Sequence, residues 1–129
     1  MGAFDMLAIA NTSLGVHQTW LDALAHNISN TNTMRRTGES AFQAQMVVAR
    51  ARPGGGVDVG GIALSDPEGR LVHSPDNPLA DADGMVRAPE IDMASQMSQL
   101  VMAQRGFQAS VQVTKNAQDT YNSALQIGR

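Results

Sequence analysis

The stretch "ALAHNISNTNTMRR", residues 23–36, shows how the N-terminal part of the chain ends. Leu24 still keeps helical spacing, yet Asn27, Asn30 and Asn32 crowd the same turns. Asparagine is a poor residue for a helix interior, because its side chain competes for backbone hydrogen bonds. An amide also donates and accepts hydrogen bonds without adding charge. We therefore expect these three asparagines to make contacts at a helix end. The rest of the sequence indicates what they contact.

Length and composition narrow the possible functions. A chain of 129 residues is one small domain, or one domain with extensions. Its formal net charge of −3 argues against nucleic-acid binding, and no apolar run is long enough to span a membrane. The first residues lack the basic start and long apolar stretch of a cleaved secretory signal. Zero cysteines exclude disulfides and thiol chemistry.

The chain is poor in bulky side chains. It holds three Phe, one Tyr and one Trp, so its apolar mass comes mainly from Ala, Val, Leu and eight Met. Such a composition supplies little material for an independent core in so short a chain. We expect the chain to complete its burial against other chains.

The chain divides into three parts. All five prolines and most of the twelve glycines lie between about residues 37 and 89. We therefore place an N-terminal helical segment at 1–34, an irregular segment at 35–89 and a C-terminal helical segment at 90–129. The expected fold is mainly α with a small β middle segment. The two long helices form an antiparallel coiled-coil hairpin, with a β-hairpin and an ordered loop between them.

The N-terminal helix carries a heptad pattern, which favours a left-handed coiled coil. One set of positions seven residues apart is Leu7, Leu14, Leu21 and Ile28, and its expected companion set is Phe4, Asn11, Gln18 and Ala25. A further apolar row lies roughly opposite this seam and consists of Ile9, Val16, Trp20 and Ala23. A helix with two apolar faces needs more than one partner.

The C-terminal helix repeats this design. Its main heptad set is Met93, Leu100, Phe107, Thr114 and Tyr121, and the expected companion set is Met97, Gln104, Val111, Gln118 and Leu125. A second stripe runs through Ile91, Met102, Ala109, Val113 and Ile127. We expect each helix to keep its second face for other subunits. The other positions are mostly Gln, Asn, Ser and Thr, an uncharged polar coat suited to contact among many copies. A soluble helical bundle is the simpler alternative.

The middle segment is expected to be partly extended. The run "FQAQMVVARA" is followed by "RPGGG", a strong turn signal, and "VDVGGIAL" alternates well enough to be the partner strand. Leu71 and Val72 indicate a further short strand. The stretch 73–89, which holds three of the prolines, is predicted to be loop.

No catalytic or metal-binding arrangement is readable. His17, His26 and His73 are not spaced to converge on one metal ion, and structural roles are the expectation. "DADG" at 81–84 lacks the remaining ligands of a calcium loop and is expected to be a turn. "PGGGVDVGG" lacks the lysine of a phosphate-binding loop. We predict no enzyme activity, no cofactor and no metal.

At this point the chain resembles the axial proteins of the bacterial flagellum, which keep heptad-bearing helices at both termini. "ALAHNISNTNT" is similar to the family pattern Ala-x-Asn-(apolar)-x-Asn-x-Asn-Thr. The matching positions are Ala25, Asn27, Ile28, Asn30, Asn32 and Thr33, whereas Thr31 replaces the common alanine.

Two further segments resemble the proximal rod proteins of the FlgC type within that family. "NPLADADGMVRAPEIDMASQM" matches their Asn-Pro-x-Ala-(Asp/Asn)-x-x-Gly-(apolar)-Val stretch at Asn77, Pro78, Ala80, Asp81, Gly84, Met85 and Val86, then at Pro89, Asp92 and Met97. "RGFQASVQV" is similar to a segment of their last helix at Arg105, Phe107, Ala109 and Val111. Met85 replaces the more usual aromatic residue.

The resemblance implies a structural subunit of the flagellar basal-body rod. Its partners would be other rod proteins, the basal-body ring and adaptor proteins and the flagellar export apparatus. Its place would be the periplasmic rod, reached by type III export without a cleaved signal, and rod subunits surround a channel for later subunits. Alternatives are a different proximal rod subunit and a non-polymerising helical adaptor of a type III secretion apparatus. The residues expected to contact other subunits are Leu7, Leu14, Leu21, Asn27, Ile28, Asn30, Asn32, Leu100, Phe107, Val111, Tyr121 and Leu125.

Overall fold

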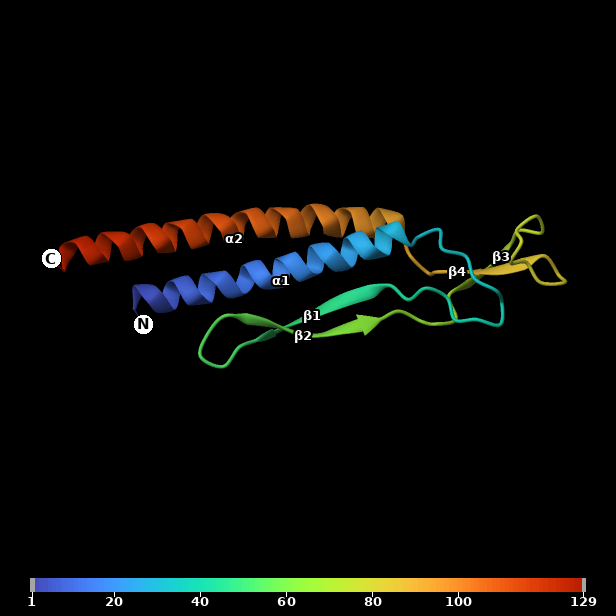
Figure 1. Cartoon of the computed structure of the whole chain (residues 1–129), viewed down its shortest axis with the longest axis horizontal. Coiled ribbons are helices and arrows are strands. Elements are labelled where there is room, and N and C mark those ends of the chain that lie inside the picture. The colour runs from blue at the N-terminus through green and yellow to red at the C-terminus, as the bar shows by residue number, and fades with distance from the viewer. Residues whose placement is uncertain (1, 129) are drawn as a thin grey trace.

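Two long antiparallel helices are the main elements of the structure. The computed structural model describes residues 2–128, with α1 at Ala3–Ser29 and α2 at Met93–Ile127. Figure 1 shows the two helices side by side, with the start of α1 and the end of α2 at the same end of the molecule. The middle segment holds only short strands. The predicted fold class, a helical hairpin with a small β segment, is confirmed.

Polar side chains define three of the four helix ends. The backbone N–H of Gly2 donates to the Asp5 carboxylate at the start of α1, 2.9 Å away. At its end, the Asn30 amide donates to the carbonyl of His26, and the Thr31 hydroxyl donates to that of Ile28. These side chains therefore satisfy carbonyl groups that have no partner within the helix. The carboxylate of Asp92 caps the start of α2, where it accepts from two backbone N–H groups.

The seam between α1 and α2 uses the predicted main heptad sets but different companion sets. The buried and half-buried positions at heptad spacing along this seam are Leu7, Ala10, Leu14, His17, Leu21, Leu24 and Ile28 in α1, and Gln96, Leu100, Ala103, Phe107, Ser110, Thr114, Ala117 and Tyr121 in α2. The expected companion sets, Phe4 to Ala25 and Met97 to Leu125, are exposed. A companion three residues or four residues after each main position fits a heptad equally well. The structure uses the companions three residues on, where Ala10, Ala103 and Ala117 let the helices approach, while the amides of Asn11 and Gln104 stay in water.

His17 fills a notch in α2. Its imidazole Nδ1 lies 2.8 Å from the carbonyl oxygen of Ser13 and 3.2 Å from the hydroxyl of Ser110. The ring occupies the place that a side chain at Gly106 would take, since a Cβ there would lie 2.7 Å from the imidazole Cδ2. Gly106 is therefore required for this close contact, which fixes the register of the two helices.

A two-stranded ribbon covers a second face of α1. β1 (Gln45–Ala51) pairs antiparallel with β2 (Val57–Leu64), which confirms the predicted β-hairpin. Figure 1 shows the ribbon along α1, on the side away from α2. Val47 and Ala49 of β1 line a small hollow together with Val16 and Trp20. The chain therefore covers part of this face of α1, at Val16 and Trp20, with its own hairpin.

A second hairpin extends the molecule beyond the helices. β3 (Arg70–His73) pairs antiparallel with β4 (Met85–Ala88), and Figure 1 shows them at the end away from the termini. The strand expected around Leu71 and Val72 is confirmed. The prediction of loop throughout 73–89 is wrong at residue 73, the end of β3, and at residues 85–88. Val86 and Ala88 are fully buried there, and burial outweighs the surrounding prolines and glycines.

The core is built mostly from alanine. The buried apolar side chains are Ala10, Ala23, Leu24, Ala41, Ala44, Val86, Ala88, Ala103 and Ala117. Small side chains bring the backbones of α1, α2 and the ribbon close together. Each buries little apolar area, so the packing supplies less free energy than a core of Leu and Phe would.

Asn27 joins three separate segments. Its side chain is 1% exposed and lies between the end of α1, the start of β1 and the start of α2. Its Nδ2 donates to the carbonyl of Gln45 (2.9 Å) and to Oε1 of Gln96 (3.0 Å), and its Oδ1 accepts from the N–H of Gln45 (2.8 Å). The amide thus pairs with both backbone groups of one residue, as a neighbouring strand would.

We expect Asn27→Ala to lower the free energy of unfolding by about 3 kcal/mol, because it leaves the buried N–H and C=O of Gln45 without partners. Asn32→Ala is the matched control: Asn32 is exposed, and the change should stay within about 0.5 kcal/mol. Denaturant unfolding followed by circular dichroism measures both. Equal stabilities of the two variants would contradict the role given to Asn27.

Gly106→Ala should destabilise the chain by roughly 1–3 kcal/mol, although alanine is the better helix former, because the new methyl group meets His17. Gly15→Ala is the control, since a Cβ at Gly15 meets no atom within 4 Å. That variant should gain up to about 1 kcal/mol from helix propensity. Thermal melts of both variants test this prediction. A Gly106→Ala chain that is more stable than the wild type would contradict the close contact between Gly106 and His17.

Candidate interaction surfaces

The outer surface of α2 is apolar and uncovered. Three members of the expected second stripe have high exposure: Met102 at 55%, Val113 at 55% and Ile127 at 85%. Ala109 between them is exposed as well. Another flank of α2 exposes Met97, Val101, Val111 and Leu125. A row of half-exposed large apolar side chains along a 35-residue helix is the usual mark of a surface that another protein covers.

The structure separates the residues expected to contact other subunits into two groups. Val111, Leu125 and Asn32 are exposed. The others lie within the chain: Asn27 is buried and hydrogen-bonded internally, Asn30 caps α1, and the half-buried residues of the α1–α2 seam are Leu7, Leu14, Leu21, Ile28, Leu100, Phe107 and Tyr121. The internal bonds of Asn27 leave its amide no free face for a neighbour.

A groove runs between α1 and the β2 strand. It encloses about 330 Å³ and is lined by Asn11, Thr12, Gly15, Val16 and Thr19 of α1, by Val57, Asp58 and Val59 of β2, and by Arg52. Ile62 and Leu64 continue the β2 wall. They pair with Val47 and Gln45, so their side chains lie on the ribbon face that holds Val47 against α1, yet they stay 47% and 54% exposed.

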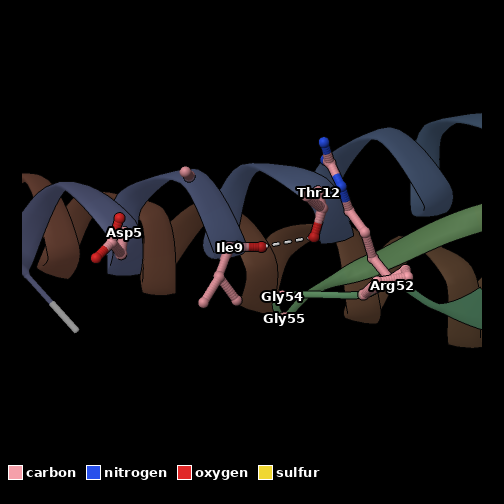
Figure 2. A pocket seen from close by; sticks show the side chains of 8 residues that line it. Asp5, Ile9, Thr12, Arg52, Gly54 and Gly55 are labelled. Carbon is pink, nitrogen blue, oxygen red and sulfur yellow. Dashed lines mark hydrogen bonds between the residues drawn. The ribbon is translucent and has the colours of Figure 1, made fainter.

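The groove continues into a hollow of about 420 Å³ at the tip of the ribbon. Figure 2 shows this hollow between α1, with Asp5, Ile9 and Thr12, and the turn that carries Arg52, Gly54 and Gly55. The hydroxyl of Thr12 accepts from the N–H of Val57 (3.0 Å) and donates to the carbonyl of Ile9 (2.7 Å). These two bonds hold the turn against the helix.

The glycine run of this turn is needed for its shape. Gly54, Gly55 and Gly56 have φ angles of 91°, 105° and 93°, a region that favours glycine. A Cβ at Gly55 would also lie 2.9 Å from Cδ1 of Ile9. Sequence reasoning recognised the turn but not the groove, because the sequence does not show how the ribbon packs against the helix.

Most charges of the helices and the ribbon have no salt-bridge partner among the residues that the structure describes. Among residues 2–128, the one salt bridge joins Arg87 to Glu68, 3.3 Å apart. Asp22, Arg52, Arg105 and Asp119 are all exposed. The carboxylate of Asp22 accepts a hydrogen bond from the amide of Gln18 (3.0 Å). These charges remain available to another chain.

The "DADG" segment forms a turn closed by Asp81. Its Oδ1 accepts from the N–H groups of Met85 (2.9 Å) and Asp83 (3.0 Å), and its Oδ2 accepts from the hydroxyl of Thr37 (3.1 Å). The bond from Met85, supported by the other two, lowers the pKa of Asp81 below its ordinary value of 3.8. Across the described part of the chain, no three His, Asp or Glu residues are grouped as metal ligands. Neither described helix is long and apolar enough to cross a membrane.

Acid should loosen this turn. The pKa of Asp81 is lower in the folded chain, so the bonds contribute stability above its ordinary value and lose it as the pH falls through the folded value. We expect the amide protection factors of Asp83 and Met85 to drop as the pH is lowered from neutral through the ordinary Asp value of 3.8 and below it, as measured by NMR hydrogen exchange. Asp81→Asn should remove this dependence. An equal drop in that variant would contradict the assignment.

Comparison with known proteins adds two findings. The family described as "Flagellar basal body rod FlgEFG protein C-terminal" matches residues 82–127, which span β4 and α2. The chain is also similar over its whole length to proteins named flagellar basal-body rod protein FlgC. It is 30% identical to that of Salmonella typhimurium, 32% to that of Yersinia enterocolitica and 27% to that of Bacillus subtilis, with 100% of each chain covered.

Proposed function

Because this chain belongs to the FlgC family of flagellar basal-body rod proteins and is a structural subunit of the rod, we propose that it assembles through the exposed surfaces of α2 and the groove beside α1. The observation that carries this proposal is the uncovered apolar surface along α2. Relatives named FlgC over the full length do not favour a helical adaptor.

Assembly would complete the burial that the single chain lacks. The core is mostly alanine, while Met102, Val113 and Ile127 stay more than half exposed. Burying a large apolar side chain stabilises by about 1.5–3 kcal/mol, so a row of them supplies a strong driving force for polymerisation. Val111 and Leu125, on the other flank of α2, would contact further subunits.

The three-part division of the chain gives each part a role in this proposal. Segments 1–34 and 90–129 build the rod wall, and segment 35–89 braces α1 and extends toward a neighbouring layer. The partners are other rod proteins, the basal-body ring and adaptor proteins, and the export apparatus that delivers the chain to the periplasmic rod. Gln and Asn side chains on the helices suit the lining of a channel for unfolded chains, because they hold passing segments weakly whatever their charge. The role is structural, not enzymatic.

Val113→Glu tests the proposal. A charge in the middle of the stripe must be buried on assembly without a partner, so incorporation into basal bodies should fall at least about tenfold and swimming should stop. The isolated variant should keep its helix content, because Val113 is 55% exposed in the single chain. Immunoblots of purified basal bodies and circular dichroism provide the two readouts.

Gln108→Glu is the matched control, because Gln108 is exposed on the same helix but lies outside the stripe. It adds the same charge but replaces a residue that is already polar, so its incorporation should fall much less than that of Val113→Glu. Wild-type swimming of Val113→Glu would show that the stripe is not an assembly surface.

A further inference from the structure

We propose that the groove between α1 and β2 receives α2 of a second copy of this chain, running antiparallel to α1, in a register set by two salt bridges. The pairs are Asp22 of one copy with Arg105 of the next, and Arg52 of one copy with Asp119 of the next. This inference rests on the proposed function and names the partner of the α2 stripe.

The groove has the composition of a helix-binding site. Its β2 wall presents Val59, Ile62 and Leu64, and the last two are about half exposed although they lie on the α1 side of the ribbon. The α1 wall presents Gly15 and Thr19. An exposed glycine in a helix interior costs about 1 kcal/mol relative to alanine, and no contact within the chain requires Gly15. A helix of another copy that packs close to Gly15 would explain why a glycine stands at this position.

The α2 stripe has a matching shape and composition. Met102, Ala109 and Val113 recur at heptad spacing, the pattern by which one helix packs into a groove. Arg105 lies one turn from Met102 and from Ala109, at the edge of this stripe. The stripe itself carries no charge, so burying it in the groove brings no unpaired ion of its own out of water.

Four charged residues determine which helix enters the groove and in which direction that helix runs. Along the groove, Asp22 lies beyond Thr19 at one end, and Figure 2 shows Arg52 beside Thr12 toward the other, roughly 15 Å away along α1. On α2, Arg105 and Asp119 are two heptads apart, so they lie on one side of the helix with a separation of roughly 21 Å. The long side chain of Arg52 spans the difference between these two separations. Both pairs form only when α2 runs antiparallel to α1.

The arrangement suits a polymer of identical chains. The groove and the stripe are different surfaces of one chain, so their contact is heterologous and leaves a free groove and a free stripe at the two ends. Such a contact repeats from copy to copy. None of the four charges has a salt-bridge partner among residues 2–128.

Charge reversal tests the register. Asp22→Arg and Arg105→Asp, each alone, should reduce incorporation into basal bodies roughly fivefold, since each replaces an attraction by a repulsion. The double variant Asp22→Arg/Arg105→Asp should return to within about twofold of the wild type. Asp22→Arg/Arg52→Glu is the control. It has the same net charge as the double variant but places like charges at both contacts, so it should not recover.

Cross-linking tests the contact itself. The natural chain has no cysteine, so any disulfide reports an introduced pair. Two differently tagged chains, one with Thr19→Cys and one with Ala109→Cys, are co-expressed and the assembled basal bodies are oxidised. We expect a heterodimer that carries both tags.

The outcomes separate this inference from the proposed function. If Val113→Glu blocks assembly but the charge reversals do not recover in the double variant and no heterodimer forms, the α2 stripe meets a different surface and the inference is wrong. A cross-link that forms only with another rod protein would also show that the inference is wrong. If Val113→Glu assembles normally, the proposed function itself fails.

Discussion

The structure depends on the buried amide of Asn27. One side chain pairs with the N–H and C=O of Gln45 and with the amide of Gln96, so it links α1 to β1 and to α2 at once. Aspartate and serine lack the two N–H donors of this group, and glutamine is one methylene longer. The Asn-rich helix end that the sequence shows is therefore mainly a junction inside the chain. Asn30 and Thr31 satisfy the carbonyls at the helix terminus beside it.

From this junction the two helices run toward the termini with progressively less support. Near the junction, Ala23 and Leu24 are buried. His17 in its notch fixes the register in the middle. Near the termini, Phe4 and Tyr121 meet with ring centroids 6.5 Å apart, yet Phe4 is 66% exposed. Figure 1 shows α2 continuing past the start of α1, and near the end of α2 Leu125 and Ile127 are 55% and 85% exposed. The far ends of the helices are thus the parts that a neighbour would stabilise most.

The sequence predicts the helices, the ribbon and their antiparallel arrangement because heptad spacing and the Pro-Gly turn are local signals. It does not choose between Ala10 and Asn11 as seam residues, because both fit the heptad and only the packing of backbones decides. It also misses β4, whose burial of Val86 and Ala88 depends on a distant strand. The α2 stripe was visible as a heptad pattern. The groove was not, since the exposure of Ile62 and Leu64 depends on how the ribbon packs against α1, which a local pattern does not show.

The central claim is that the chain is well ordered at the Asn27 junction and incomplete along α2. Residue-resolved amide hydrogen exchange on the isolated protein and on assembled basal bodies tests it most directly. We expect strong protection in the isolated chain near Asn27, Gln45 and Gln96, falling toward residue 127, and strong protection along all of α2 after assembly. Uniform protection along α2 in the isolated chain, unchanged by assembly, would contradict it.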